Sequence, residues 1–129
     1  MNILSNYEGS SIDILRYNNV ENSAYLSLKK ENDSYSQYYN FIIDNNQNKD
    51  GYVYIQNIKL SKYYEKNSIF FPYKRIESSN EWQRIDNNSF SIADNMLVIK
   101  IKPNEKFEIS LVPRYTKEHL ERFLDTIKN

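Results

Sequence analysis

The residues best suited to chemistry lie near the C-terminal end, in the stretch PRYTKEHLERFL (113–124), where the single histidine, His119, stands between Glu118 and Glu121. Histidine and carboxylates can bind zinc or act as a general acid and base. A zinc site of the His-x-x-Glu type needs a glutamate three residues after the histidine and a second histidine elsewhere. Here the third residue is Arg122, and the chain has no other histidine. Nor does the sequence offer His119 a nucleophile or an enclosed cleft. We therefore expect no catalytic and no metal-binding residues in this chain.

The same stretch has the features of a helix start. Thr116 is a good N-cap, Glu118 falls in the first turn where the helix dipole favours a carboxylate, and Tyr115 can pack on Leu120 as a hydrophobic staple. One face of the helix then carries apolar residues at the i, i+3, i+4, i+7 spacing, namely Leu120, Phe123, Leu124 and Ile127. The pattern predicts an amphipathic C-terminal helix over residues 116–128, with His119 beside its apolar stripe.

Other candidate sites are weaker. Paired carboxylates of the glycosidase type could be drawn from Glu77, Glu81, Asp86 and Glu105, but 17 acidic residues on a small surface make chance pairs common. The only glycines, Gly9 and Gly51, exclude a Gly-rich phosphate loop. An aromatic platform for sugars remains an alternative, although large aromatic residues in strands more often cover a core. Its members would be Tyr52, Tyr54, Tyr63, Tyr64 and Trp82.

Composition excludes several classes of function. The 17 Lys and Arg residues balance 17 Asp and Glu residues, so no positive field attracts nucleic acid. The absence of cysteine removes disulfides and Cys-based zinc sites, which favours a cytosolic origin. The sequence shows neither a signal peptide nor an apolar run of membrane-spanning length, so we expect no membrane partner. The 129 residues fit one domain with a sizeable core.

Short apolar segments with polar breaks between them predict an all-β domain. In five of these segments, alternation places the apolar residues on one face of a strand. The five sets are Ala24, Leu26 and Leu28; Tyr39, Phe41 and Ile43; Val53 and Ile55; Leu97, Ile99 and Ile101; and Phe107, Ile109 and Leu111. Tyr52 and Tyr54 lie on the face opposite Val53 and Ile55. Ile12 and Ile14 likewise share a face. With further strands in SIFFPYKRI (68–76) and EWQRI (81–85), the sequence predicts an antiparallel β-sandwich of about eight or nine strands.

Two connections suggest hairpins. The turn-forming run DNNQNKDG (44–51) separates YYNFII from YVYIQNIKL, and PNEK (103–106) separates NMLVIKIK from FEISLV. We expect each pair of flanking strands to be hydrogen-bonded neighbours, and the second pair to be the most secure pairing in the chain.

The order of several segments resembles a known family. EGSSIDIL is similar to an early strand of that family. LSLKKENDSYSQYYNFII is similar to a strand ending in Asp that is followed by an aromatic-rich strand. YIQNIKLSKYY is similar to a strand that ends in Asn, with Ser-Tyr soon after it. PYKRIESSNEWQRI resembles a Y-R-P…S-x-D-G-x-x-W-x-R-I element through Tyr73, Ser78, Trp82 and Arg84, and VPRYTKEHL resembles a Pro-Tyr-Ser/Thr junction before a helix. Ser79-Asn80-Glu81 replaces the Asp-Gly turn, and Arg114 separates Pro113 from Tyr115. Together, from about Tyr7 onward, these segments resemble the N-terminal β-sandwich domain of cytosolic-carboxypeptidase-type zinc carboxypeptidases.

The resemblance implies that residues 1–129 form a non-catalytic domain, joined through the 116–128 helix to a carboxypeptidase domain that follows it. In the family, the zinc ligands and catalytic residues belong to that second domain, which acts on peptide substrates. The first domain would support its folding and shape access to its groove, in the cytoplasm. We expect Trp82, Tyr115 and Thr116 at the interface between the two domains. The alternative is a stand-alone β-sandwich that binds carbohydrate or protein.

Overall fold

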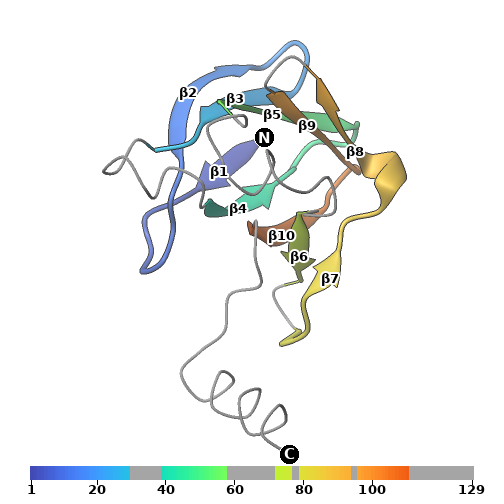
Figure 1. The fold of residues 1–129 in the computed structure, drawn as a ribbon. Coiled ribbons are helices and arrows are strands. Elements are labelled where there is room, and N and C mark those ends of the chain that lie inside the picture. Colours follow the sequence, from blue (N-terminus) through green and yellow to red (C-terminus); the bar gives the residue numbers. More distant parts are fainter. Residues whose placement is uncertain (30–38, 58–71, 77–78, 94–95, 111–129) are drawn as a thin grey trace, which may run out of the picture.

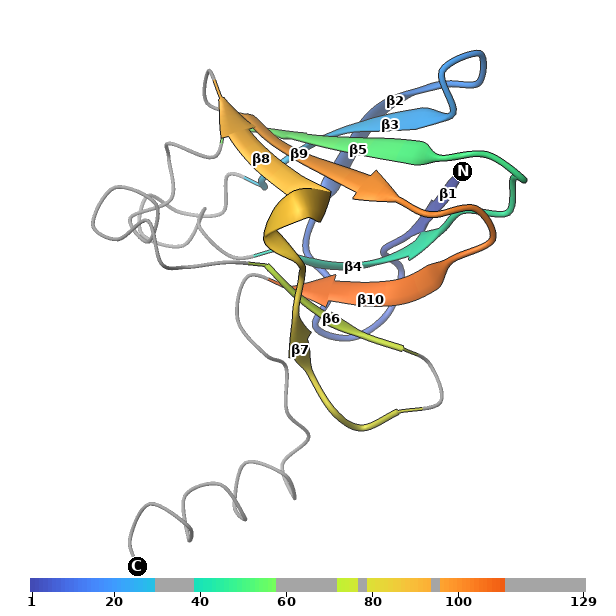
Figure 2. The same cartoon turned by 90° about the vertical axis from the view of Figure 1, so that its right-hand side faces the viewer.

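The computed structural model describes residues 1–29, 39–57, 72–76, 79–93 and 96–110, which form two five-stranded sheets packed face to face (Figures 1 and 2). Sheet A has the order β1-β4-β10-β6-β7, and sheet B has the order β2-β3-β5-β9-β8. The strands are β1 (Asn2–Leu4), β2 (Asp13–Asn18), β3 (Ser23–Ser27), β4 (Asn40–Asp44), β5 (Gly51–Gln56), β6 (Tyr73–Arg75), β7 (Gln83–Arg84), β8 (Phe90–Ala93), β9 (Met96–Ile101) and β10 (Lys106–Ser110). A short 3-10 helix, η2 (Asn87–Ser89), precedes β8. The predicted β-sandwich is confirmed.

The core lies between the two sheets and consists mainly of residues that alternation assigned to it, together with Ile3 and Ile85, which were not predicted. Sheet A contributes Tyr39, Phe41, Ile43, Phe107 and Ile109, and sheet B contributes Ala24, Leu26, Val53, Ile55, Leu97, Ile99 and Ile101; each is at most 3% exposed. Burying side chains of this size stabilises a fold by roughly 1.5–3 kcal/mol each. Tyr52 and Tyr54 face away from this core, as predicted.

Both predicted hairpins are wrong. β4 belongs to sheet A and β5 to sheet B, while β9 belongs to sheet B and β10 to sheet A. The two connections, residues 45–50 and 102–105, therefore cross between the sheets instead of turning within one (Figure 2). Period-2 alternation fixes which face of a strand is buried, but either a hairpin or a crossover satisfies that pattern. Both crossovers lie at the same end of the sandwich (Figure 2).

Asn45 explains why these crossovers are stable. Its Nδ2 donates to the carbonyl oxygens of Lys49 and Lys102, both at 2.9 Å, and its Oδ1 accepts from Asn22 Nδ2 at 2.9 Å. Its backbone N–H donates to Glu105 at 2.9 Å. The side chain is fully buried. It supplies hydrogen bonds to backbone carbonyl groups in the connections, where no neighbouring strand can supply them.

Further pairings depart from the expected antiparallel pattern. β3 and β5 are parallel neighbours in sheet B, because the chain crosses to sheet A to form β4 between them. β1 and β8 were not predicted; at three and four residues they are too short for alternation to reveal. Ile14 lies opposite Leu26, on the core-facing side, yet it is 39% exposed because β2 is the edge strand of sheet B.

Several predictions concern residues outside the described ranges. The C-terminal helix, His119, Tyr115, Thr116, Tyr63, Tyr64 and Leu111 all lie there, and so do residues 68–71 of the segment 68–76. Among the described residues, no helix is long and apolar enough to cross a membrane.

Candidate interaction surface on sheet A

The outer face of sheet A carries a row of residues that runs across β1, β4, β10 and β6 and ends at the residue before β7. Leu4 of β1 lies opposite Ile42 of β4, Ile42 opposite Glu108 of β10, and Glu108 opposite Arg75 of β6. Trp82 continues the β6–β7 register opposite Arg75, and the Arg75 Cζ atom stands 5.0 Å from the centre of its ring. We call these five residues the sheet A row.

Glu108 is the buried charge of this row. Its side chain is 8% exposed, its Oε1 accepts a hydrogen bond from Arg75 Nη2 at 2.5 Å, and its Oε2 accepts from Asn40 Nδ2 at 2.8 Å. The Tyr7 hydroxyl in turn donates to Asn40 Oδ1. A buried carboxylate is tolerated only when it is paired and hydrogen-bonded, and both requirements are met here.

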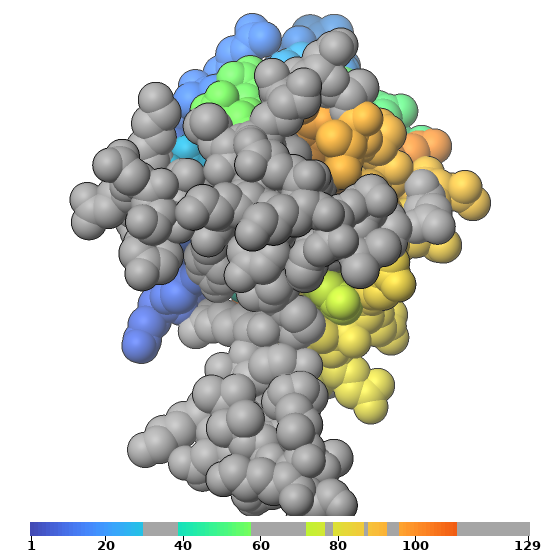
Figure 3. Space-filling view, viewed as in Figure 1, coloured from blue at the N-terminus to red at the C-terminus, as the bar shows by residue number. Residues whose placement is uncertain are grey.

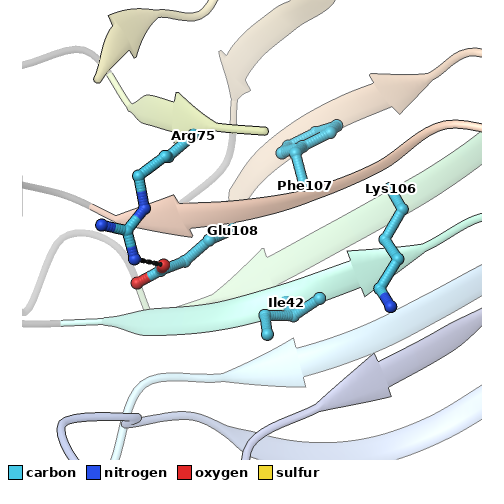
Figure 4. Close-up of a pocket in the computed structure, with 5 residues that line it drawn as sticks. All are labelled: Ile42, Arg75, Lys106, Phe107 and Glu108. Atoms are coloured by element: carbon cyan, nitrogen blue, oxygen red, sulfur yellow. Dashed lines mark hydrogen bonds and ion pairs between the residues drawn. The ribbon is translucent and has the colours of Figure 1, made fainter. Parts of the chain in front are cut away.

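A hollow of about 170 Å³ opens beside Glu108, lined by Ile42, Arg75, Lys106, Phe107 and Glu108. Figure 4 shows Arg75 and Glu108 at one end, Ile42 along β4, and Lys106 at the opposite end. The hollow thus combines an apolar wall with a guanidinium and an ammonium group. Such a combination suits an amphipathic anion better than a sugar or a neutral apolar ligand.

The outer face of sheet B carries a second cluster of polar and aromatic residues. The rings of Tyr25 and Tyr54 stack at 4.7 Å between centroids, with 13° between their planes, and Arg16 Cζ lies 4.2 Å from the centre of the Tyr25 ring. Both tyrosine hydroxyls donate to the Glu21 carboxylate. The hydrogen bond to Glu21, together with burial and the nearby negative charge, raises the pKa of Tyr54 to about 12.

This cluster bears on the sugar-platform alternative. One face of the Tyr54 ring is covered by Tyr25, and Tyr25 lies between Tyr54 and Arg16. Trp82 belongs to the other sheet, beside Arg75. The structure therefore does not bring Tyr54 and Trp82 together, and Tyr63 and Tyr64 lie outside the described residues.

The candidate acids do not gather either. Glu105 pairs with Lys74 at 3.7 Å. Asp86 precedes η2, Glu81 is exposed, and Glu77 lies outside the described ranges. Within the described part of the chain, no three His, Asp or Glu side chains are placed to hold a metal ion.

Sequence reasoning missed Glu108, Arg75 and Asn40. Alternation placed Glu108 on the outer side of its strand, where a carboxylate normally meets water. The one sequence feature that pointed to a buried polar contact was Asn40, a polar residue inside the aromatic and apolar run YYNFII. The ion pair joins residues 33 positions apart, and the pattern of either strand alone could not reveal it.

Comparison with known proteins identifies the family of this β-sandwich. The family model described as the cytosolic carboxypeptidase N-terminal domain matches residues 3–111. The chain belongs to this family. The match runs from β1 to just past the end of β10, so this N-terminal domain comprises both sheets of the sandwich. A search of curated proteins finds no match.

Solved structures share the fold of this N-terminal domain. A protein assigned as a carboxypeptidase A from Shewanella denitrificans aligns with a TM-score of 0.75 and 18% identity, over 99% of this chain and 33% of its own. A metallo-carboxypeptidase from Burkholderia cenocepacia aligns with a TM-score of 0.72 and 15% identity, over 99% of this chain and 33% of its own. A metallo-carboxypeptidase from Pseudomonas aeruginosa, in complex with (2-guanidinoethylmercapto)succinic acid, aligns with a TM-score of 0.72 and 14% identity. The alignment covers 98% of this chain and 33% of that protein. The chain spans about a third of the length of these proteins.

Proposed function

We propose that this chain is the non-catalytic N-terminal domain of a zinc carboxypeptidase, and that it supports the folding of, and substrate access to, a catalytic domain in the same polypeptide. The observation that carries the proposal is the family match over residues 3–111, combined with the one-third coverage of structures that include metallo-carboxypeptidases. In this proposal the catalytic domain binds the zinc and removes C-terminal residues from peptides. The protein would act in the cytoplasm.

The arrangement of the described residues is consistent with a supporting role. Three acidic residues make structural contacts: Glu108 with Arg75 and Asn40, Glu21 with two tyrosines, and Glu105 with Lys74. We place the catalytic domain against the end of the sheet A row, at Trp82. Tyr115 and Thr116 would then form the junction between the domains. Figure 3 shows the segment that begins at residue 79, in yellow, on the lower right surface of the molecule.

Co-expression tests the proposal. The gene is read beyond codon 129 for a segment with a His-x-x-Glu motif and a second histidine, and that segment is produced with and without residues 1–129. We expect the segment to be soluble and to release C-terminal amino acids with bound zinc only when residues 1–129 accompany it. A segment that folds and hydrolyses peptides equally well alone would contradict the supporting role, and the lack of a carboxypeptidase segment would contradict the proposal as a whole.

A further inference from the structure

We propose that the hollow on sheet A is a binding site for a small aliphatic carboxylate, with Arg75 pairing to the carboxylate and Ile42 contacting the alkyl part. The proposal concerns residues 1–110 alone and does not depend on a catalytic domain. It rests on three features of the hollow: the donors of Arg75, the balance of charge, and the volume.

Arg75 has hydrogen-bonding capacity left over. A guanidinium carries five N–H donors in a planar fork that fits a carboxylate. Among the described residues, only Glu108 accepts from Arg75, and it does so through Nη2. The side chain is 22% exposed, so few of the remaining donors can be fully hydrated. Contact with Trp82 at 5.0 Å and the 2.5 Å bond to Glu108 fix the orientation of the fork before any ligand arrives.

The local charge favours an anion in spite of Glu108. Both oxygens of that carboxylate already accept hydrogen bonds, one from Arg75 and one from Asn40. Lys106 adds a second positive group at the far end of the hollow (Figure 4). Among the lining residues that the structure describes, two side chains, Arg75 and Lys106, are cationic and one, Glu108, is anionic. Coulomb attraction at such a partly buried site is several times stronger than in bulk water.

The volume sets the size of the ligand. A space of about 170 Å³ corresponds to about five or six water molecules at roughly 30 Å³ each. It fits an acid of about six heavy atoms, with Ile42 beside its carbons. Two sources supply this chemistry: a free short-chain acid, and the C-terminal carboxylate of a peptide whose last residue has a small side chain.

Titration of the ¹⁵N-labelled 129-residue chain tests the site. The probes are butyrate, its neutral isostere butyramide, acetyl-trialanine with a free carboxylate, and the same peptide as an amide. We expect saturable shifts of the Arg75 Nε–H and of the Ile42 and Glu108 amides with butyrate, with a Kd on the order of 1 mM. The two neutral compounds should leave these signals unshifted. Stronger binding by the free peptide than by butyrate would identify a chain terminus as the natural ligand, and the reverse order would identify a free acid.

Three variants sharpen the test. Lys106→Gln removes an exposed charge at the hollow, and Lys100→Gln removes one from the outer face of sheet B, where Lys100 pairs with Asp50 at 3.5 Å. We expect Lys106→Gln to weaken butyrate binding by about threefold and Lys100→Gln to leave it unchanged. Arg75→Lys keeps the charge but loses the fork and should weaken it by about tenfold. Equal shifts with butyrate and butyramide, shifts confined to sheet B, or equal effects of the two glutamine variants would each overturn the proposal.

Discussion

Asn45 donates a 2.9 Å hydrogen bond to the carbonyl oxygen of Lys102 and thereby ties together the two connections that cross between the sheets. The same side chain bonds Lys49 in its own loop and Asn22 in the turn before β3. Three segments far apart in the sequence therefore depend on one buried amide.

Replacing Asn45 should consequently be costly. Asn45→Ala leaves the carbonyl groups of Lys49 and Lys102 without this donor, and each unsatisfied buried group costs about 1–3 kcal/mol. We expect the free energy of unfolding in urea to fall by about 2–4 kcal/mol. The neighbouring exposed Asn46 offers a matched control, since Asn46→Ala should change it by less than about 0.5 kcal/mol. Equal effects at both positions would show that the Asn45 network contributes little.

The Arg75–Glu108 pair predicts non-additive mutations. Arg75→Met leaves the 8% exposed Glu108 carboxylate without its cation and should destabilise the fold by about 2 kcal/mol, a value reduced from that of a fully buried pair because Arg75 is 22% exposed. Adding Glu108→Leu removes the stranded charge and should recover much of the loss. Urea unfolding of the two single variants and the double variant measures the coupling. Simple addition of the two single effects would mean that the pair is not coupled in the folded state.

Gly51 predicts a steric effect at the start of β5. A Cβ atom there would lie 2.3 Å from Met1 Cε and 3.2 Å from the carbonyl oxygen of Asn22. The methionine end can move, but the Asn22 backbone is fixed by its hydrogen bond from Tyr52. Gly51→Ala should therefore lower the free energy of unfolding by about 1 kcal/mol. A stabilised Gly51→Ala variant would contradict the close approach of the turn to β5.

Tyr54 predicts a change of stability in alkaline solution. Its folded pKa of about 12 lies above the ordinary tyrosine value of 10.0, so the folded state holds the phenol proton more tightly than the unfolded state does. This contribution is complete below pH 10 and is lost as the pH rises from about 10 to 12. Absorbance titration near 295 nm should include a late phenol from Tyr54, and Glu21→Gln should bring the pKa of this phenol back toward the ordinary value. No change in Glu21→Gln would assign the late phenol to another residue.

The sequence was sufficient for the fold class and for the core, because alternation in segments such as NMLVIKIK determines which side chains face inward. It could not determine strand partners: the PNEK turn chemistry fits a hairpin, whereas the chain crosses to sheet A at that point. What decides between the two is the buried Asn45, which bonds backbone groups 4 and 57 residues away. The sheet A row could not be predicted from the sequence for a similar reason, since Arg75 and Glu108 become neighbours only when β6 and β10 pair.

The most direct test of the central claim, that this domain supports a carboxypeptidase but performs no hydrolysis, is a peptidase assay of the purified 129-residue chain loaded with excess Zn²⁺. The account predicts no release of C-terminal amino acids and no zinc retained after dialysis, with identical results for wild type and His119→Ala. Release of amino acids by the chain alone, abolished by His119→Ala, would contradict it.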